Sequence, residues 1–95
     1  MTYYLYLLRC RDNSLYCGQA NNLKRRIREH NKGKDKSAKY LRGKKPIQLV
    51  YFEKYKTIKE VMRREIEIKK WKKEKKEKLI QNFNSSHTPD SYSLQ

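Results

Sequence analysis

Acidic residues are scarce in this sequence, and no segment of it is both long and apolar. Ten Asp and Glu stand against 25 Lys and Arg, so the 95 residues carry a formal net charge of +15. A positive field of this size concentrates polyanions around a protein at modest salt, and nucleic acid is therefore the expected partner. A basic surface that serves only solubility, or that is attracted to an anionic membrane, is the alternative explanation of the charge.

Features that would send the chain to or through a membrane are also missing. No stretch approaches the roughly 20 apolar residues that a membrane span requires. Residues 1–8 lack the basic leader and the small-residue cleavage site of a signal peptide. We therefore expect a cytoplasmic protein with no membrane partner.

Cysteine and histidine number only two each. Six residues separate Cys10 from Cys17, and 56 separate His30 from His87, a spacing that fits no zinc finger. Both cysteines lie in an apolar segment, where a reduced thiol behaves as a small hydrophobic group. We expect both to pack in the core, and we expect no small-molecule cofactor.

Length and composition predict one small domain. Hydrophobic residues make up 36% of the chain and charged residues 37%, which is enough apolar surface for one compact core and little more. Residues 1–83 are expected to form this domain. Residues 84–95, NSSHTPDSYSLQ, contain turn formers and little to bury, so they are expected to form a flexible polar tail.

Short apolar runs bounded by turn formers predict three strands. The predicted strands are residues 2–9, 14–18 and 47–53. Strict alternation in the third strand places Ile47, Leu49 and Tyr51 on one face and Val50 and Phe52 on the other. Both faces of that strand are expected to be covered.

The loop between the first two strands decides which side chains share a face. A three-residue loop, residues 11–13, closes Cys10 against Ser14 and puts Tyr6 and Tyr16 on one face. A two-residue loop would separate the two tyrosines. Asn13 tolerates the left-handed conformation that the longer loop requires at its last position, so we expect the three-residue loop.

Helix-forming segments fill the rest of the chain. The predicted helices are residues 23–32, capped by Asn21 or Asn22 and closed by Gly33; residues 57–71; and residues 72–82. Thr57 and Glu60 have capping-box spacing at the start of the second helix. The third segment is either a separate helix or a bent continuation. The predicted fold is therefore α+β, a small three-stranded antiparallel sheet flanked by helices in the order β-β-α-β-α-α.

The first helix has one face that mixes apolar and reactive side chains. At 100° per residue, Leu23 and Ile27 define its buried stripe, and Arg26 and His30 lean toward the same side. Lys24, Arg25 and Arg28 fall on the far side. Arg26 along the core edge and His30 as a semi-buried, hydrogen-bonded histidine are the structural explanation of this pattern.

The second long helix carries an acidic residue on its apolar side. Its expected buried stripe consists of Ile58, Val61, Met62 and Ile68, with Glu65 near the middle. An ionised carboxylate that faces a core is costly unless it is paired or binds a cation. A buried ion pair between Glu65 and Arg26 is the structural alternative to cation binding.

The order of these motifs resembles that of the GIY-YIG nuclease superfamily, in particular its small single-domain members and the amino-terminal domain of the excision-repair incision subunit. The resemblance covers about residues 2–82. It rests on Tyr-Leu-Tyr at 4–6, Tyr-Cys-Gly at 16–18, Leu-x-x-Arg-x-x-x-His at 23–30 and Glu65. The chain departs from the pattern where Tyr4-Leu5 replaces Gly-Ile and where Cys17 replaces Ile.

The resemblance implies a set of site residues. The implied catalytic residues are Tyr6, Tyr16, Arg26, His30, Tyr40 and Glu65, with Gly18 in a structural role. Glu65 would hold a single Mg²⁺ or Mn²⁺, and Arg26 would bind the phosphate. Tyr6 or Tyr16 would contact the attacking water, although a phenol with a pKa of about 10 must be acidified to act as a base at neutral pH. His30 and Tyr40 would assist.

The function implied is a divalent-metal-dependent endonuclease that hydrolyses DNA with low sequence specificity, on branched, damaged or single-stranded substrates, as in DNA repair. Outward-facing bases are expected to contact the nucleic-acid backbone: Arg25, Arg28, Lys69, Lys72 and Lys73. The alternative is a module on the same fold that binds structured RNA or DNA without cleaving it.

Overall fold

The computed structural model describes residues 1–32, 41 and 43–86. Its elements are β1 (Tyr3–Arg9), β2 (Leu15–Ala20), α1 (Leu23–Lys32), β3 (Gln48–Tyr55), α3 (Ile58–Lys69) and α4 (Lys73–Ser86). The strands form one antiparallel sheet in the order β2-β1-β3. The predicted α+β class and the predicted order of elements are confirmed.

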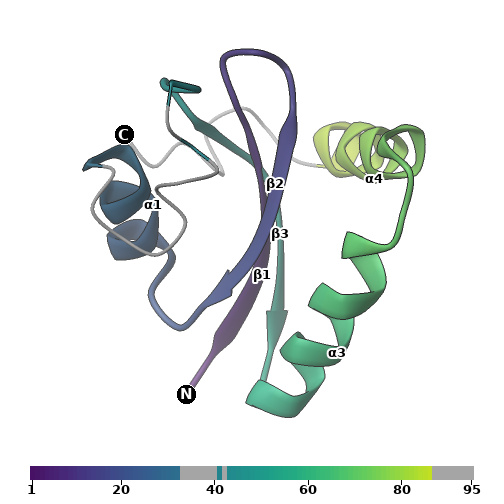
Figure 1. Ribbon diagram of the computed structural model, residues 1–95. Helices are drawn as coiled ribbons and strands as arrows, with labels where there is room; N and C mark the ends of the chain where they lie inside the picture. Colours follow the sequence, from purple (N-terminus) through teal and green to yellow (C-terminus); the bar gives the residue numbers. More distant parts are fainter. Residues whose placement is uncertain (33–40, 42, 87–95) are drawn as a thin grey trace.

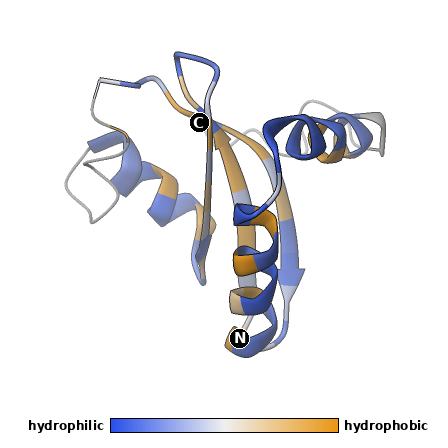
Figure 2. Ribbon diagram, turned by 45° about the vertical axis from the view of Figure 1, so that its right-hand side comes forward, coloured by the Kyte–Doolittle hydropathy of each residue, from blue (hydrophilic) through white to orange (hydrophobic). Residues whose placement is uncertain are grey.

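The sheet lies between two helical layers. In Figure 1, α1 covers one face of the sheet, and α3 and α4 cover the other. The central strand β1 is therefore buried on both sides. Leu5 and Leu7 face α3 and α4, Tyr6 and Leu8 face α1, and all four are fully buried. This explains the apolar run near the start of the chain, which Figure 2 shows as the orange centre of the sheet.

The hairpin between β1 and β2 has the predicted three-residue loop. Arg9 pairs with Leu15, and the Cys10 amide donates to the Ser14 carbonyl at 2.9 Å. Asn13 adopts φ 72°, the left-handed conformation that this loop needs. Because the register follows from the loop, Tyr6 and Tyr16 lie on the same face of the sheet, the face that α1 covers.

Helix α1 has the predicted bounds and the predicted buried face. Asn22 caps it, with its side-chain oxygen accepting from the Arg25 amide at 3.1 Å. Leu23, Ile27 and His30 are its buried residues. Gly33, the predicted end of this helix, lies outside the described residues.

The predicted alternation in the third strand is wrong at Tyr51. The register between β1 and β3 shifts between Leu7 and Leu8, so that Leu7 opposes Tyr51 while Leu8 opposes Leu49. Val50 is the extra residue of this β-bulge. Tyr51 therefore packs with Leu7 on the α3 face, whereas Leu49 packs on the α1 face.

The predicted stripe of α3 is also only partly correct. Val61 and Ile68 are fully buried, but Ile58 is 50% exposed and Met62 is 46% exposed. A three-stranded sheet is narrow, and it covers only a narrow stripe of the helix. The side of α3 that carries Ile58 and Met62 is therefore left open.

The last two helices are separate. Helix α3 begins after Thr57, whose side chain accepts from the Glu60 amide at 3.2 Å, and it ends at Lys69. Helix α4 runs to Ser86, so residues 84–86, predicted as the start of the tail, are helical. Residues 87–95 lie outside the described part of the chain. None of the helices described is long and apolar enough to cross a membrane.

Candidate active site

The predicted site residues come from four elements that meet around the edge strand β2. Tyr16 and Gly18 lie on β2 itself, and Tyr6 lies on the neighbouring strand β1. Arg26 and His30 come from α1. Glu65 comes from α3. Figure 1 shows β2 running between these two helices, so the edge strand is where groups from both layers can act on one substrate.

Two tyrosines and the histidine form a contact cluster under α1. The Tyr6 hydroxyl lies 2.7 Å from His30 Nε2, and both side chains are fully buried. The Tyr16 ring meets the His30 ring edge-on, with centroids 5.3 Å apart. Tyr16 is only partly buried. Of the two predicted tyrosines, Tyr16 is therefore the one that reaches the surface, and Tyr6 supports His30 from below.

Gly18 makes this arrangement possible. It lies opposite Tyr6 in the register of β1 and β2. A Cβ at this position would lie 2.6 Å from the Tyr6 hydroxyl oxygen and 3.2 Å from a carbon of the Tyr16 ring. Only a residue without a side chain leaves room for both rings.

Arg26 stands at the edge of the α1 core with its guanidinium accessible. Its side chain is 30% exposed, and Nη1 lies 3.4 Å from the Glu29 carboxylate one turn on. A planar guanidinium at the rim of a surface cavity is well suited to bind phosphate oxygens.

Glu65 is half-buried over β2. Its side chain is 19% exposed, and its carboxylate lies 3.1 Å from Lys69 Nζ on the next turn of α3. Burial, followed by the negative charge of Glu65, raises the pKa of the Cys17 thiol to about 11. Burial alone would lower the pKa of Lys69, but the hydrogen bond to Glu65 and the charges of Glu65, Cys17 and Tyr16 raise it overall. The charges of Glu65 and Lys69 therefore both act on Cys17 of β2.

The observed ion pairs test the alternative in which Glu65 forms a buried ion pair with Arg26. Glu65 pairs with Lys69, and Arg26 pairs with Glu29, so a pair between Glu65 and Arg26 is not needed to account for the charge of either residue. Lys69 is 54% exposed and can move away from the carboxylate. The Glu65 carboxylate is thus held in place but remains reachable from solvent.

Within the described ranges, no three His, Cys, Asp or Glu side chains gather into a group that could hold a metal ion. A metal at Glu65 would therefore have one protein carboxylate, with water and phosphate oxygens as its other ligands. Mg²⁺ is commonly held in this way, by one or two carboxylates and the phosphates of a substrate. The donor set at Glu65 fits a single hard divalent cation.

The remaining predicted residues are Tyr40 and five basic side chains. Tyr40 lies outside the described residues. The bases that were expected to contact the nucleic-acid backbone are all exposed: Arg25, Arg28, Lys69, Lys72 and Lys73. Lys69 is the partner of Glu65, and Lys73 Nζ lies 3.6 Å from the Glu77 carboxylate.

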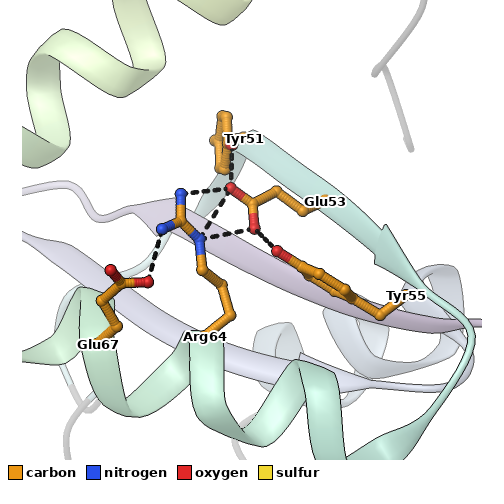
Figure 3. Close-up of polar contacts among 5 residues, drawn as sticks. All are labelled: Tyr51, Glu53, Tyr55, Arg64 and Glu67. Atoms are coloured by element: carbon orange, nitrogen blue, oxygen red, sulfur yellow. Dashed lines mark hydrogen bonds and ion pairs between the residues drawn. The ribbon is translucent and has the colours of Figure 1, made fainter.

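A polar cluster that the sequence pattern did not predict fixes α3 to β3, and we call it the Glu53 clamp (Figure 3). It consists of Tyr51, Glu53 and Tyr55 on β3 and Arg64 and Glu67 on α3. Arg64 donates from Nε and Nη2 to the Glu53 carboxylate at 3.0 and 2.9 Å, and from Nη1 to Glu67 at 2.7 Å. Both tyrosine hydroxyls donate to Glu53.

Electrostatics in the Glu53 clamp favour the charged pair. Burial alone would raise the pKa of Glu53, but the hydrogen bonds from Arg64 and the tyrosines hold it below its usual value. The hydrogen bond to Glu53 raises the pKa of Arg64, while burial and the nearby carboxylate raise that of Tyr55 to about 12. The available signal in the sequence was a carboxylate between two tyrosines at alternate positions of a covered strand.

The Glu53 clamp bears on the site through Arg64. Successive residues on a helix point about 100° apart, so Arg64 and Glu65 flank the buried stripe of α3 on opposite sides. With Arg64 anchored on β3, Glu65 is directed toward β2.

A small antiparallel sheet that brings tyrosines, an arginine, a histidine and a glutamate to one edge strand is the arrangement of the GIY-YIG nuclease superfamily. Residues 2–78 match the family model of the GIY-YIG catalytic domain, and the chain belongs to this family.

Its relatives include small single-domain proteins of the same superfamily. A UPF0213 protein of Haloquadratum walsbyi is 42% identical over 87 residues, which cover 92% of this chain and 96% of the relative. The solution structure of a UPF0213 protein from Bacillus halodurans is similar with a TM-score of 0.55 and 41% identity, over 85% of this chain and 84% of that one. A second solution structure, of a protein from E. faecalis, has a TM-score of 0.62 and 35% identity, with coverages of 92% and 91%.

Proposed function

We propose that the protein is a divalent-metal-dependent endonuclease that hydrolyses phosphodiester bonds of DNA with low sequence specificity, and that it acts in the cytoplasm. The observation that carries the proposal is the Glu65 carboxylate, which is half-buried over β2 near Cys17 and whose ion-pair partner among the described residues is an exposed lysine. The GIY-YIG family implies a nucleic-acid substrate in general. The high positive charge of the chain favours the same class of substrate.

The side chains have distinct parts in the proposed reaction. Arg26 binds the oxygens of the scissile phosphate and stabilises the charge that develops on them. Tyr16, the tyrosine that reaches the surface, contacts the attacking water. Tyr6 holds His30 against Tyr16 and acts as a positioning residue.

Glu65 would hold the divalent ion, which supplies positive charge at the phosphate when it is bound. Lys69 is exposed and would release the carboxylate to such an ion. The rest of the chemistry depends on the residues of the chain, which bind the phosphate and place the water.

The test is the Glu65→Ala variant. It should lose cleavage in Mg²⁺ or Mn²⁺ while it keeps its affinity for DNA. Cleavage is measured on labelled single-stranded, branched and duplex DNA, and Glu74→Ala, which removes an exposed carboxylate from α4, is the matched control. The proposal fails if the wild-type protein leaves all three substrates intact with Mn²⁺.

One observation favours the alternative, a binding module without catalysis. Lys69 already neutralises Glu65, so the carboxylate needs no metal in order to be stable in place. A binding module would keep both affinity and function in the Glu65→Ala variant.

A purely structural role for Glu65 is tested by stability. An i,i+4 pair with an exposed lysine contributes only about 0.3–0.5 kcal/mol, so Glu65→Ala should unfold at nearly the wild-type denaturant concentration. A large loss of stability would instead show that the carboxylate is a structural element of the fold.

A further inference from the structure

A cavity of about 260 Å³ opens beside Arg26, where β2 ends and α1 and α3 both begin. Three kinds of side chain in its wall bear on what it can bind. They are two guanidinium groups, three amides and two large, mostly apolar side chains: Arg25, Arg26, Gln19, Asn21, Asn22, Tyr3 and Ile58. Glu29 also lines the cavity, and it is paired with Arg26.

We propose that this cavity binds one unpaired nucleotide of the DNA strand that is cleaved, close to the scissile phosphate. The inference rests on the proposed function and names its substrate class, which is DNA with a single-stranded segment at the cleavage site. Each kind of wall group has a counterpart in a nucleotide. Guanidinium groups bind the phosphate, amides offer both donors and acceptors to a base edge, and the apolar side chains cover the face of the base.

The position of Ile58 connects this cavity to Glu65. The two residues are seven positions apart on α3, which places them about 10 Å apart along the helix and on nearly the same side of it. Met62 lies between them and is also exposed. A DNA strand whose phosphate lies at Glu65 and Arg26 therefore reaches the cavity along an apolar surface.

Exposed isoleucine and methionine on one side of a helix are unusual in a chain with 37% charged residues. The narrow sheet leaves these side chains uncovered, and an unstacked base would cover them. A base inside a continuous duplex cannot do so, because both of its faces are stacked on neighbouring base pairs. The cavity is also smaller than typical small-molecule pockets, which suits a single base better than a larger ligand.

The experiment compares two DNAs bound by the Glu65→Ala protein, which should bind without cleaving. One DNA is a duplex with a short single-stranded gap, and the other is the same sequence fully paired. A 2-aminopurine in the gap reports by fluorescence whether a base is buried. The gapped DNA should bind about tenfold more tightly than the duplex, because stacking and apolar contacts to one base are of this size.

Two isoleucines of α3 supply the variant and its control. Ile58→Ala should reduce the preference for gapped DNA about fivefold and leave duplex affinity unchanged, since it removes apolar contact with the base alone. Ile66→Ala should leave the preference unchanged. Ile66 is 56% exposed, comparable to Ile58 at 50%, but it is not part of the cavity wall. Both positions are exposed, so neither change should disturb the fold, and a thermal melt checks this.

Two arginines of α1 supply a second comparison. Arg25→Ala should weaken binding of gapped DNA more than binding of duplex, because Arg25 lines the cavity. Arg28→Ala should weaken both alike, since it is exposed and lies outside the cavity wall. An abasic gap, which lacks the base but keeps the phosphates, should lose the preference.

The proposal is overturned if Ile58→Ala and Ile66→Ala give the same preference, or if the abasic gap binds as well as the intact gap. Cleavage by the wild-type protein is measured separately. If the wild-type protein cleaves DNA but Ile58→Ala does not change the preference for gapped DNA, the nuclease proposal stands and the cavity proposal fails. If the wild-type protein cleaves none of the DNAs but prefers gapped DNA, and Ile58→Ala abolishes that preference, the cavity binds an unpaired nucleotide and the nuclease proposal fails.

Discussion

Tyr6 and Tyr16 are equivalent in the sequence pattern but not in the folded protein. Tyr6 belongs to the central strand and is sealed under α1, whereas Tyr16 belongs to the edge strand and is partly exposed. A group that contacts water and phosphate must be reachable from solvent. In the proposed reaction, Tyr16 is therefore the tyrosine that contacts the water, and Tyr6 positions His30 through a buried hydrogen bond.

Gly18→Ala should destabilise the protein by about 1–3 kcal/mol, because an extra methyl group in a well-packed core forces neighbouring side chains or backbone to shift. The new Cβ would meet the Tyr6 hydroxyl at 2.6 Å and its ring carbon at 2.7 Å. The loss is measured by urea unfolding of the two proteins. On a Tyr6→Leu background, which removes the phenol ring, the same substitution should cost clearly less. An equal cost on both backgrounds would show that the ring is not the obstacle.

Between elements, the contact that most constrains the site is the Glu53 clamp, which joins β3 to α3. It anchors Arg64 on one side of the helix and so determines which way Glu65 points on the other. The two carboxylates around Arg64 differ in exposure, with Glu53 at 16% and Glu67 at 57%. The contact of Arg64 with the buried Glu53 should therefore be stronger than its contact with the exposed Glu67.

Glu53→Gln should lower the free energy of unfolding at pH 7 by about 2–4 kcal/mol, because the partly buried Arg64 guanidinium loses its buried counter-charge and keeps the exposed Glu67. Glu67→Gln, the matched control, removes an exposed partner of the same arginine and should cost less than about 1 kcal/mol. Urea unfolding of the three proteins measures both. Similar losses of unfolding free energy in the two variants would show that the burial of Glu53 does not strengthen its contact with Arg64.

The Glu53 clamp also predicts a pH dependence. The folded state holds the pKa of Glu53 below the ordinary value of 4.5, so its contribution is fully present above that pH. It is lost as the pH falls below 4.5 and through the folded-state pKa, because the carboxylate then takes up a proton in the folded state as well. Wild-type stability should therefore fall more steeply than that of Glu53→Gln in this acidic range. If the unfolding free energies of the two proteins fall in parallel with pH, the pKa of Glu53 is not lowered in the folded state.

At the scale of the whole molecule, the net charge of +15 on 95 residues is the dominant property. Exposed bases follow α1, the end of α3 and the start of α4, and α1 and α3 also carry predicted site residues. Binding of this kind releases counterions from DNA, and its strength depends steeply on salt. In the proposed function, the charge therefore serves mainly to bind nucleic acid, and the site residues carry out the cleavage.

The logarithm of DNA affinity should fall linearly with the logarithm of salt concentration, and Lys72→Ala or Lys73→Ala should each reduce the slope by about one. Fluorescence anisotropy at several salt concentrations measures the slope. Lys54→Ala is the control, because Lys54 is exposed on β3, the opposite edge of the sheet from β2. If all three variants share one slope, Lys72 and Lys73 do not contact DNA.

Local patterns in the sequence were sufficient for most of the framework. The hairpin register followed from the conformation that Asn13 tolerates, and the bounds and buried face of α1 followed from its cap and its 3.6-residue period. These features depend on neighbours within a few positions, where backbone sterics and local hydrogen bonds decide the outcome. The order of the motifs was enough to indicate the GIY-YIG family.

Contacts between distant segments determined the rest. The bulge at Val50 turned Tyr51 to the other face, and the narrow sheet left Ile58 and Met62 exposed beside Glu65. The sequence pattern does not show that Tyr6 meets His30, 24 positions on, or that Glu53 holds Arg64, 11 positions on. Such contacts arise only when strands and helices pack together, because packing decides which polar groups are buried and must find a partner there.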